Sequence, residues 1–368
     1  MPGFIRRWQA ELGDTYVLGL VRVVLGVLLF WQALVWAREL AEGGYFGDVF
    51  HLPMLPESFV PSRMVYTAII AALLVLAALA TVGHRARFAL LASAGLGLYV
   101  LLCDRLQFHH NRYALLCIAG LLSLAPCDRS FVITGAPVAP SARLGPLWAQ
   151  RLAQLQLSII YVASGTSKLM DDDWRDGLVL GDRMMRHASE AIDRGVPGAL
   201  VDFFTRPTTA SGLAKVAIAT ELFLAVGLWL NKTRVFALWW GVLFHLTIEL
   251  TSNVEQFTWL ALASYALFVT PDAHARRFFF DPSRPKSVLY ARLVASMDWV
   301  DRFEIRPWAP DQLRDGHSIV VVRRDGSRAT GIRAFAMVTR CIPLLFLLWA
   351  PVALVASFTK GGETSARA

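Results

Sequence analysis

Long uninterrupted runs of apolar residues are the feature that most constrains how this chain folds. The first run covers residues 16–37, and it is long enough for a helix to cross the roughly 30 Å hydrocarbon core of a bilayer. Of the 368 residues, 55% are hydrophobic and 17% are charged. Soluble domains have about 45–50% apolar and about 25% charged residues. The runs and the composition together predict a polytopic membrane protein.

Eight apolar segments are predicted to be transmembrane helices. They comprise residues 16–37, 65–83, 86–103, 113–127, 147–168, 213–231, 234–250 and 257–271. A ninth apolar run, residues 341–358, contains two prolines and either lies on the membrane or forms a ninth span. The predicted fold class is an all-α polytopic membrane bundle of about eight transmembrane helices, or nine, with a small C-terminal α/β domain.

Lys and Arg are distributed unevenly between alternate loops, and this bias predicts the orientation of the bundle. Basic residues occur at Arg6 and Arg7, in the turns 83–87 and 231–234, and in the loop after the fourth span. The loops 38–64, 169–212 and 251–256 are acidic or neutral. Because cytoplasmic loops carry the Lys and Arg excess, both termini are predicted to be cytoplasmic. The first run is too long for a signal peptide.

The segment after the last span differs in kind from the bundle. Residues 278–280, 303–305 and 318–323 are predicted to be strands, and residues 288–300 are predicted to be an amphipathic helix. Asp325-Gly326 is a hairpin-turn signal. The predicted domains are therefore a transmembrane domain over 1–272, a small α/β domain over 277–358 and a disordered tail over 359–368.

Two ionisable residues lie inside predicted spans, where burial is costly unless the group has a partner. Arg22 lies near the cytoplasmic end of the first span and either extends to the lipid headgroups or takes part in a site. Glu221 lies near the middle of the sixth span, too far from either surface to reach water. It is interpreted as a tie between helices or as part of a functional site.

The outer ends of several spans carry polar residues that the predicted topology brings to one depth. These residues are His109, His110, Asn111, Lys168, His245 and Glu249. Their convergence predicts a site at the outer membrane face. A lysine at a helix end is also a common interface anchor, and a histidine in a membrane turn is often structural, so both alternatives remain open.

Other classes of site have little support. The histidines show neither HxxxH nor HExxH spacing, so no metal site is predicted. The four cysteines form no CxxC pair and are interpreted as small apolar residues. The net charge is +8, but the sequence shows no basic stripe interleaved with the stacking aromatic residues that nucleic-acid binding needs. No nucleic-acid partner is therefore predicted. The lipid bilayer is the expected partner.

Several segments resemble the HTTM family, which includes the vitamin K-dependent γ-carboxylases and bacterial relatives. The central segment, residues 156–169 followed by Asp173-Trp174 and Gly177, is similar to the signature of the family. Other matching pieces are Arg22 with Gly26, the turn 110–113, and the segments 221–224 and 244–246. The resemblance covers about residues 10–272.

The resemblance implies an enzyme of the bacterial inner (plasma) membrane with a site on its outer face. Lys168 would be the base that deprotonates a vitamin K-like hydroquinone, and His110 and His245 would be further catalytic residues. The hydroquinone anion would then react with O₂ to give a strong base that removes a proton from a peptide glutamate, to which CO₂ adds. Residues expected to line the quinone site are His109, Asn111, Tyr161, Trp174 and Glu221.

The base role requires a neutral Lys168, so Asp171, Asp172 and Asp173 are expected to point into water. The lumenal part that captures the protein substrate of the carboxylases has no counterpart here. A non-catalytic partner that binds a lipid, quinone or exported peptide and assists the maturation or export of another protein is therefore the alternative hypothesis. A transporter is a third reading, without an internal repeat to support it.

The C-terminal segment resembles a DCC-type, thioredoxin-like domain. The similar pieces are residues 280–287, Asp298-Trp299 and residues 331–335. The loop that carries two cysteines in that family has Ser283 or Arg284 and Ser287 here. Thiol–disulfide exchange needs a thiolate, so this domain is expected to be redox-inactive.

Overall fold

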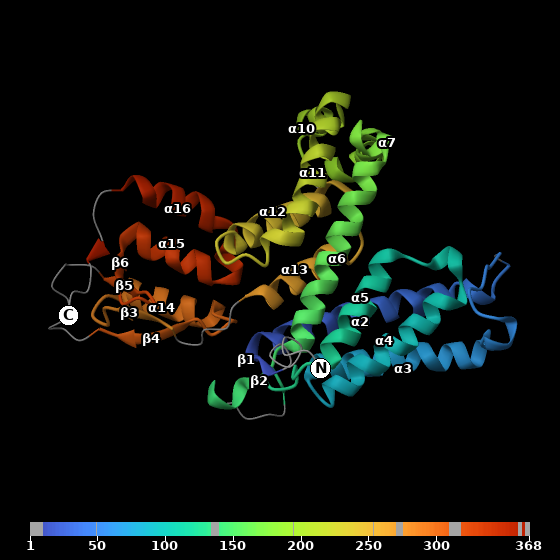
Figure 1. Ribbon diagram of the computed structural model, residues 1–368, viewed down its shortest axis with the longest axis horizontal. Helices are drawn as coiled ribbons and strands as arrows, with labels where there is room; N and C mark the ends of the chain where they lie inside the picture. Colours follow the sequence, from blue (N-terminus) through green and yellow to red (C-terminus); the bar gives the residue numbers. More distant parts are fainter. Residues whose placement is uncertain are drawn as a thin grey trace. The chain divides into compact units, whose positions relative to one another are not determined.

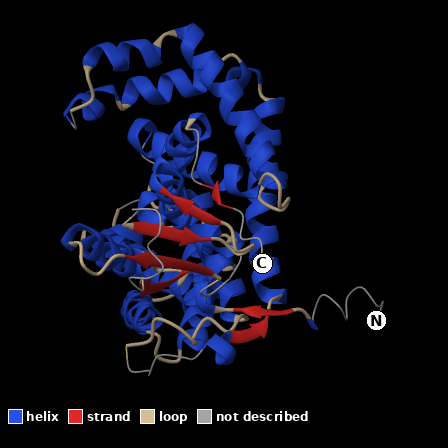
Figure 2. Cartoon of the chain, turned by 90° about the vertical axis from the view of Figure 1, so that its left-hand side faces the viewer, coloured by secondary structure: helices blue, strands red, loops and turns tan. Residues whose placement is uncertain are grey.

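The computed structural model describes residues 10–48, 50–133, 140–193, 195–252, 254–269, 275–308, 318–359 and 363–364. The chain divides into two compact units, residues 1–269 and 270–368. Helices dominate, and the strands form a two-stranded ribbon and one larger sheet (Figure 1, Figure 2).

In the described part of the chain, the first unit is built from seven helices of 14 to 26 residues and the nine-residue α13, which together account for the eight apolar segments. They are α2 (Tyr16–Ala41), α3 (Arg63–Val82), α4 (Ala86–Cys103), α5 (His110–Ser123), α6 (Trp148–Met170), α11 (Pro207–Gly227), α12 (Arg234–Ser252) and α13 (Phe257–Tyr265). Helices α2 to α5 pack in sequence order, α6 packs against α11, and α13 packs against α2.

Shorter elements connect these helices. The α-helical connectors are α7 (Asp172–Arg175), α8 (Leu178–Arg186), α9 (Ala188–Asp193) and α10 (Gly198–Thr205). The 3₁₀ turns are η1 (Gly44–Phe46), η2 (Glu57–Phe59), η3 (Arg105–Gln107), η4 (Pro140–Arg143) and η5 (Ala266–Phe268). Strands β1 (Leu12–Asp14) and β2 (Leu144–Pro146) pair antiparallel, and the sequence did not predict this ribbon.

Four helical segments among the described residues are long and apolar enough to cross a membrane: Tyr16–Phe46, Arg63–Val82, Ala86–Cys103 and Pro207–Gly227. The other four predicted spans also correspond to helices, namely α5, α6, α12 and α13. Helix α5 has only 14 residues, or about 21 Å at 1.5 Å per residue, which is shorter than the hydrocarbon core. The membrane character of the chain is supported, but the count of eight spans is not confirmed.

Arg22 does not extend to the lipid headgroups, so this interpretation was wrong. Its side chain is 0% exposed, and its guanidinium donates hydrogen bonds to the backbone carbonyls of Ser130 and Phe131 at 3.2 and 2.7 Å. It lies against Gly83, the left-handed residue (φ +88°) that ends α3, where a side chain would collide with the guanidinium. Arg22 therefore ties α2 to the α3–α4 turn and to the segment after α5.

The second unit has the order of elements that the sequence predicts. It contains β3 (Arg276–Phe280), α14 (Pro285–Met297), β4 (Phe303–Pro307), β5 (Ile319–Val322), β6 (Arg328–Thr330) and α15 (Gly331–Cys341). The sheet order is β4-β3-β5-β6-β7. Strands β3 and β4 are parallel, so α14 is the crossover between them, and β5 and β6 form an antiparallel hairpin.

The predicted hairpin turn is confirmed. Gly326 adopts a φ of +80°, which favours glycine, and the Asp325 carboxylate accepts hydrogen bonds from the backbone N–H and hydroxyl of Ser327. Of the predicted disordered tail, Glu363–Thr364 form the short strand β7, which pairs with β6. Residues 360–362 and 365–368 lie outside the described residues.

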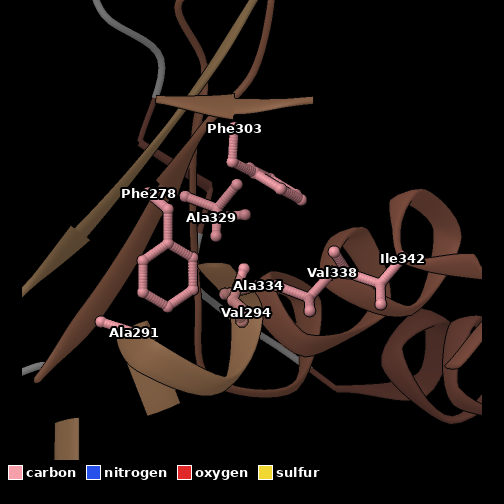
Figure 3. Close-up of a cluster of buried hydrophobic side chains, with 9 residues drawn as sticks. Phe278, Ala291, Val294, Phe303, Ala329, Ala334, Val338 and Ile342 are labelled. Carbon is pink, nitrogen blue, oxygen red and sulfur yellow. The ribbon is translucent and has the colours of Figure 1, made fainter. Parts of the chain in front are cut away.

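The core of the second unit lies between the sheet and its helices (Figure 3). Phe278 of β3 and Phe303 of β4 meet edge to face with ring centroids 6.3 Å apart. Val338 of α15 belongs to the same buried cluster. The apolar run after α15 forms η7 (Pro343–Leu348) and α16 (Trp349–Phe358), which pack against α15.

The loop before α14, where the resemblance would place two cysteines, is held by hydroxyl groups. The Asp281 carboxylate accepts hydrogen bonds from the N–H and hydroxyl of Ser283, and the Ser287 hydroxyl donates to the Asp281 carbonyl. Cys341 is the cysteine of this unit, and burial raises the pKa of its thiol. A raised pKa reduces the thiolate fraction and with it the reactivity.

Replacing Arg22 with leucine is expected to destabilise the first unit by about 2–4 kcal/mol, because two buried carbonyls lose a charged donor. The measurement is the midpoint of unfolding of the detergent-solubilised protein. Arg38→Leu is the matched control, because the Arg38 side chain on the same helix is 82% exposed and pairs only with Glu42. An equal shift in both variants would contradict the role given to Arg22.

Candidate functional site

Lys168 and Glu221 form a close ion pair between α6 and α11. The Lys168 Nζ lies 2.5 Å from Glu221 Oε1, and the two side chains are 18% and 8% exposed. The Ser164 hydroxyl contacts both groups: it accepts a hydrogen bond from Nζ at 3.0 Å and donates one to Oε1 at 3.1 Å. Glu221 therefore ties α6 to α11, in agreement with its interpretation as a tie between helices, and it contacts the lysine predicted as a base. A role for Glu221 in a functional site stays a prediction.

The spacing of residues on α6 explains why these groups face α11. Tyr161, Ser164, Gly165 and Lys168 are separated by three and four residues, which places them on one face of the helix. A Cβ atom at Gly165 would lie 2.9 Å from the Leu222 side chain of α11. The glycine thus permits the close approach that brings Glu221 within reach of Lys168.

A second polar cluster lies on the same face of α6. The Tyr161 hydroxyl is 2.8 Å from His245 Nε2 of α12 and 2.6 Å from the Tyr265 hydroxyl of α13. All three side chains are almost completely buried. Tyr161 and Lys168 are seven residues apart on the same face of α6. The structure therefore brings Lys168, Glu221, Tyr161 and His245 into one region.

Trp174 belongs to this region through its ring. Lys168 Nζ lies 4.9 Å from the ring centroid and the Arg183 guanidinium lies 5.4 Å from it, both within cation–π range. Asp171 caps α7 by accepting hydrogen bonds from the N–H groups of Asp173 and Trp174. The residues 171–173 are exposed, as predicted, so the carboxylate beside the lysine is Glu221 and not one of these.

Two buried polar atoms of the cluster, Glu221 Oε2 and His245 Nδ1, have no hydrogen-bond partner among the residues that the structure describes. Buried polar groups are nearly always hydrogen-bonded, so these two atoms are open to a hydrogen bond from a further group. A carboxylate oxygen accepts a hydrogen bond, and an imidazole nitrogen accepts or donates one according to its tautomer. The cluster is thus suited to a ligand that carries a hydroxyl group.

The structure does not bring the predicted turn residues into this cluster. His109 caps α5 and lies 3.7 Å from Glu255, and Asn111 donates to the Val254 carbonyl at 3.1 Å. His110 is exposed and packs edge to face against Phe108. Within the described parts of the chain, no hydrogen bond, ion pair or ring contact joins these three residues to Lys168, and the expected convergence of His110 with Lys168 is not observed.

The sequence did not predict a second buried pair of titratable residues, His51 and Asp104, which lies where α2 and α4 end. His51 Nδ1 lies 3.0 Å from Asp104 Oδ2, and the two residues are 53 positions apart in the chain. Asp104 directly follows α4, and His51 lies in the loop after α2. The one indication in the sequence was Asp104, a carboxylate directly after an apolar run. Its position did not show that His51 is its partner.

No metal centre is found in the part of the chain that the structure describes, where no group of three or more His, Cys, Asp or Glu residues is arranged to hold an ion.

Replacing only one residue of the Lys168–Glu221 pair should lower the free energy of unfolding more, per residue replaced, than replacing both. Lys168→Met or Glu221→Leu leaves one buried group unpaired and is expected to destabilise the protein by about 3–5 kcal/mol. The double variant should be less destabilised than the sum of the two, as measured by unfolding in detergent. Lys215→Met, at an exposed position of α11, is the control. Additive effects would contradict a coupled buried pair.

Comparison with known proteins gives one match. The sequence model of the HTTM domain family matches residues 12–273, whereas no curated protein and no solved structure matches the chain. The match ends before β3, so the DCC-type resemblance of the second unit stays a prediction. The HTTM family is linked to vitamin K-dependent carboxylase-like membrane proteins. The match extends over well more than half of the 368 residues, and the chain therefore belongs to the HTTM family.

Proposed function

We propose that this chain is an integral membrane enzyme in which the Lys168–Glu221 pair accepts a proton from the hydroxyl group of a bound quinol. The observation that carries the proposal is the buried contact of 2.5 Å between Nζ and Oε1, in which the second carboxylate oxygen, Glu221 Oε2, has no hydrogen-bond partner among the described residues. The bound quinol, oxidised by O₂, would supply the strong base that the family's carboxylases use on a peptide glutamate with CO₂.

The pair suits proton acceptance because it holds one proton between two basic groups. With the proton on nitrogen it is an ammonium–carboxylate pair, and with the proton on oxygen it is an amine and a carboxylic acid. Burial penalises separated charges and so narrows the free-energy gap between the two forms. When the ligand O–H bond breaks, its proton moves to the pair, which changes from neutral to singly positive, and the anion formed beside it balances that charge.

Glu221 Oε2 and His245 Nδ1 supply contacts for the ligand. The unpaired carboxylate oxygen can accept the hydrogen bond of a ligand hydroxyl, and it lies on the residue that also contacts Lys168. The hydrogen bond from Tyr161 and the packing of Phe257 against its ring hold His245 in position. Tyr161 and Tyr265 are therefore positioning residues. Trp174 offers an aromatic face at the end of the cluster.

The proposed location is the inner membrane of a bacterium, with the N-terminus in the cytoplasm and Lys168 near the outer face. The support is the Lys and Arg bias of the loops together with the four long apolar helices. An exported peptide would reach a site on that face.

A binding protein without catalysis is the second candidate. The observation that favours it is the same ion pair, because a carboxylate 2.5 Å from a lysine also fits a purely structural tie between α6 and α11. Mass spectrometry of lipids that co-purify with the protein distinguishes a quinol-dependent enzyme from a binding protein by the molecule that is bound. A bound quinone that is lost in Lys168→Ala supports the quinol site, whereas phospholipid alone favours the binding role.

The activity test uses purified full-length protein, a reduced naphthoquinone and O₂, with the quinone epoxide as the measured product. Lys168→Ala is expected to lower the rate of epoxide formation by about 10²–10⁴-fold, the usual contribution of a positioned base. Glu221→Gln should also lower the rate, because the pair loses its second acceptor. Lys215→Ala, at an exposed position on α11, should leave the rate unchanged. Equal product from wild type and Lys168→Ala would overturn the proposal.

A further inference from the structure

A cavity of about 260 Å³ lies away from the Lys168 region, between the end of α2, the η1 turn, α3 and the end of α4. The helices α2, α3 and α4 lie side by side (Figure 1). The cavity is lined by acidic, aromatic and other polar side chains, namely Trp36, Glu39, Glu42, Tyr45, His51, Tyr66, Asp104 and Gln107. Its volume is close to the lower end of ligand pockets, about 300 Å³, so it fits a small group.

The lining of the cavity is acidic. Three carboxylates, Glu39, Glu42 and Asp104, contribute to it, and no lysine or arginine does. Arg112 approaches Glu39 from outside the lining at 3.7 Å, which is longer than a hydrogen bond, and Arg38 pairs with Glu42 at 2.9 Å. Neither arginine lines the cavity, but each offsets part of the charge of one glutamate. Three carboxylates against two arginines leave the lining net negative, which favours a positively charged ligand.

Asp104 orients His51 toward the cavity. The carboxylate accepts hydrogen bonds from the His51 ring at 3.0 Å and from the N–H groups of Leu52 and Leu106. Burial alone would raise the pKa of the Asp104 carboxyl, but these hydrogen bonds outweigh it and hold the pKa below its usual value. The ionised Asp104 thus keeps the His51 proton on Nδ1. His51 Nε2 is then a buried acceptor without a hydrogen-bond partner in the described part of the chain.

Aromatic rings complete the wall. Tyr45 and Tyr66 are stacked with centroids 5.7 Å apart, and the His51 ring lies 4.4 Å from Tyr45. Trp36 and Tyr66 are only 4% and 8% exposed. Within the described parts of the chain, neither the indole N–H nor the Tyr66 hydroxyl makes a hydrogen bond. Aromatic faces beside carboxylates are how proteins recognise ammonium groups.

We propose that this cavity binds a primary alkylammonium group, with Glu39 and His51 Nε2 accepting its N–H hydrogen bonds and the rings of Tyr45, Tyr66 and Trp36 contacting its charge. A quaternary ammonium group has no N–H to satisfy His51, so it is the poorer ligand. The site shares no residue with the Lys168 region and does not depend on the proposed quinol chemistry.

Two sources can supply this group: the headgroup of an ethanolamine phospholipid and a free soluble amine. The cavity adjoins the ends of three apolar helices, where lipid headgroups would lie if these helices cross the bilayer.

The test uses delipidated full-length protein in detergent. Native mass spectrometry measures the binding of phosphatidylethanolamine, with phosphatidylcholine as the quaternary comparison, and ethanolamine is added as a soluble competitor. Wild type is expected to bind phosphatidylethanolamine at least 10-fold more tightly than phosphatidylcholine. His51→Ala and Glu39→Gln should each reduce that preference several-fold, whereas His84→Ala, at an exposed turn, should preserve it. Tyr66→Leu provides a second test should either of the first two variants fail to fold.

The possible outcomes distinguish a lipid headgroup from a soluble amine as the ligand, and they include results that would overturn the proposal. Displacement of the lipid by millimolar ethanolamine, or binding of ethanolamine alone, supports a soluble amine as the ligand. Preference for the lipid without such displacement supports the headgroup. Equal binding of both lipids with no effect of ethanolamine would overturn the proposal, as would a preference that persists in folded His51→Ala, Glu39→Gln and Tyr66→Leu.

Discussion

The contact between Lys168 and Glu221 is the interaction on which the candidate site depends. Two ionisable groups at the interface of α6 and α11 cannot each remain charged and unpaired away from water, so each constrains the position of the other. Gly165 permits the helices to approach, and Ser164 bridges the two groups. The same pair therefore stabilises the helix contact and supplies the proton acceptor of the proposed reaction.

Polar side chains connect helices throughout the first unit. Arg22 is bound by carbonyls more than 100 residues away, and Gln150 and Gln154 both donate to the carbonyl of Leu267. Apolar side chains gain little free energy from associating in lipid, whereas an unsatisfied polar group there is costly. These hydrogen bonds consequently help to specify which helices become neighbours.

The two polar regions use a similar arrangement for different chemistry. In each, a buried carboxylate binds a basic side chain, Glu221 with Lys168 and Asp104 with His51. Around Lys168 the unpaired atoms suit a hydroxyl donor. In the cavity near His51, three carboxylates and aromatic rings suit a cation instead. The difference lies in the surrounding side chains and not in the paired groups.

The sequence by itself determined the membrane character, the helices at all eight apolar segments and the strand and helix order of the second unit, because these follow from local apolar pattern and turn chemistry. It also proposed Lys168, Glu221, Tyr161, His245 and Trp174 as site residues, and the structure brings these five into one region. Only the tertiary structure decided that Glu221 pairs with Lys168, that His110 stays outside, and that His51 meets Asp104. Such contacts depend on helix packing and on hydrogen bonds between residues 53 or more positions apart, which no local pattern encodes.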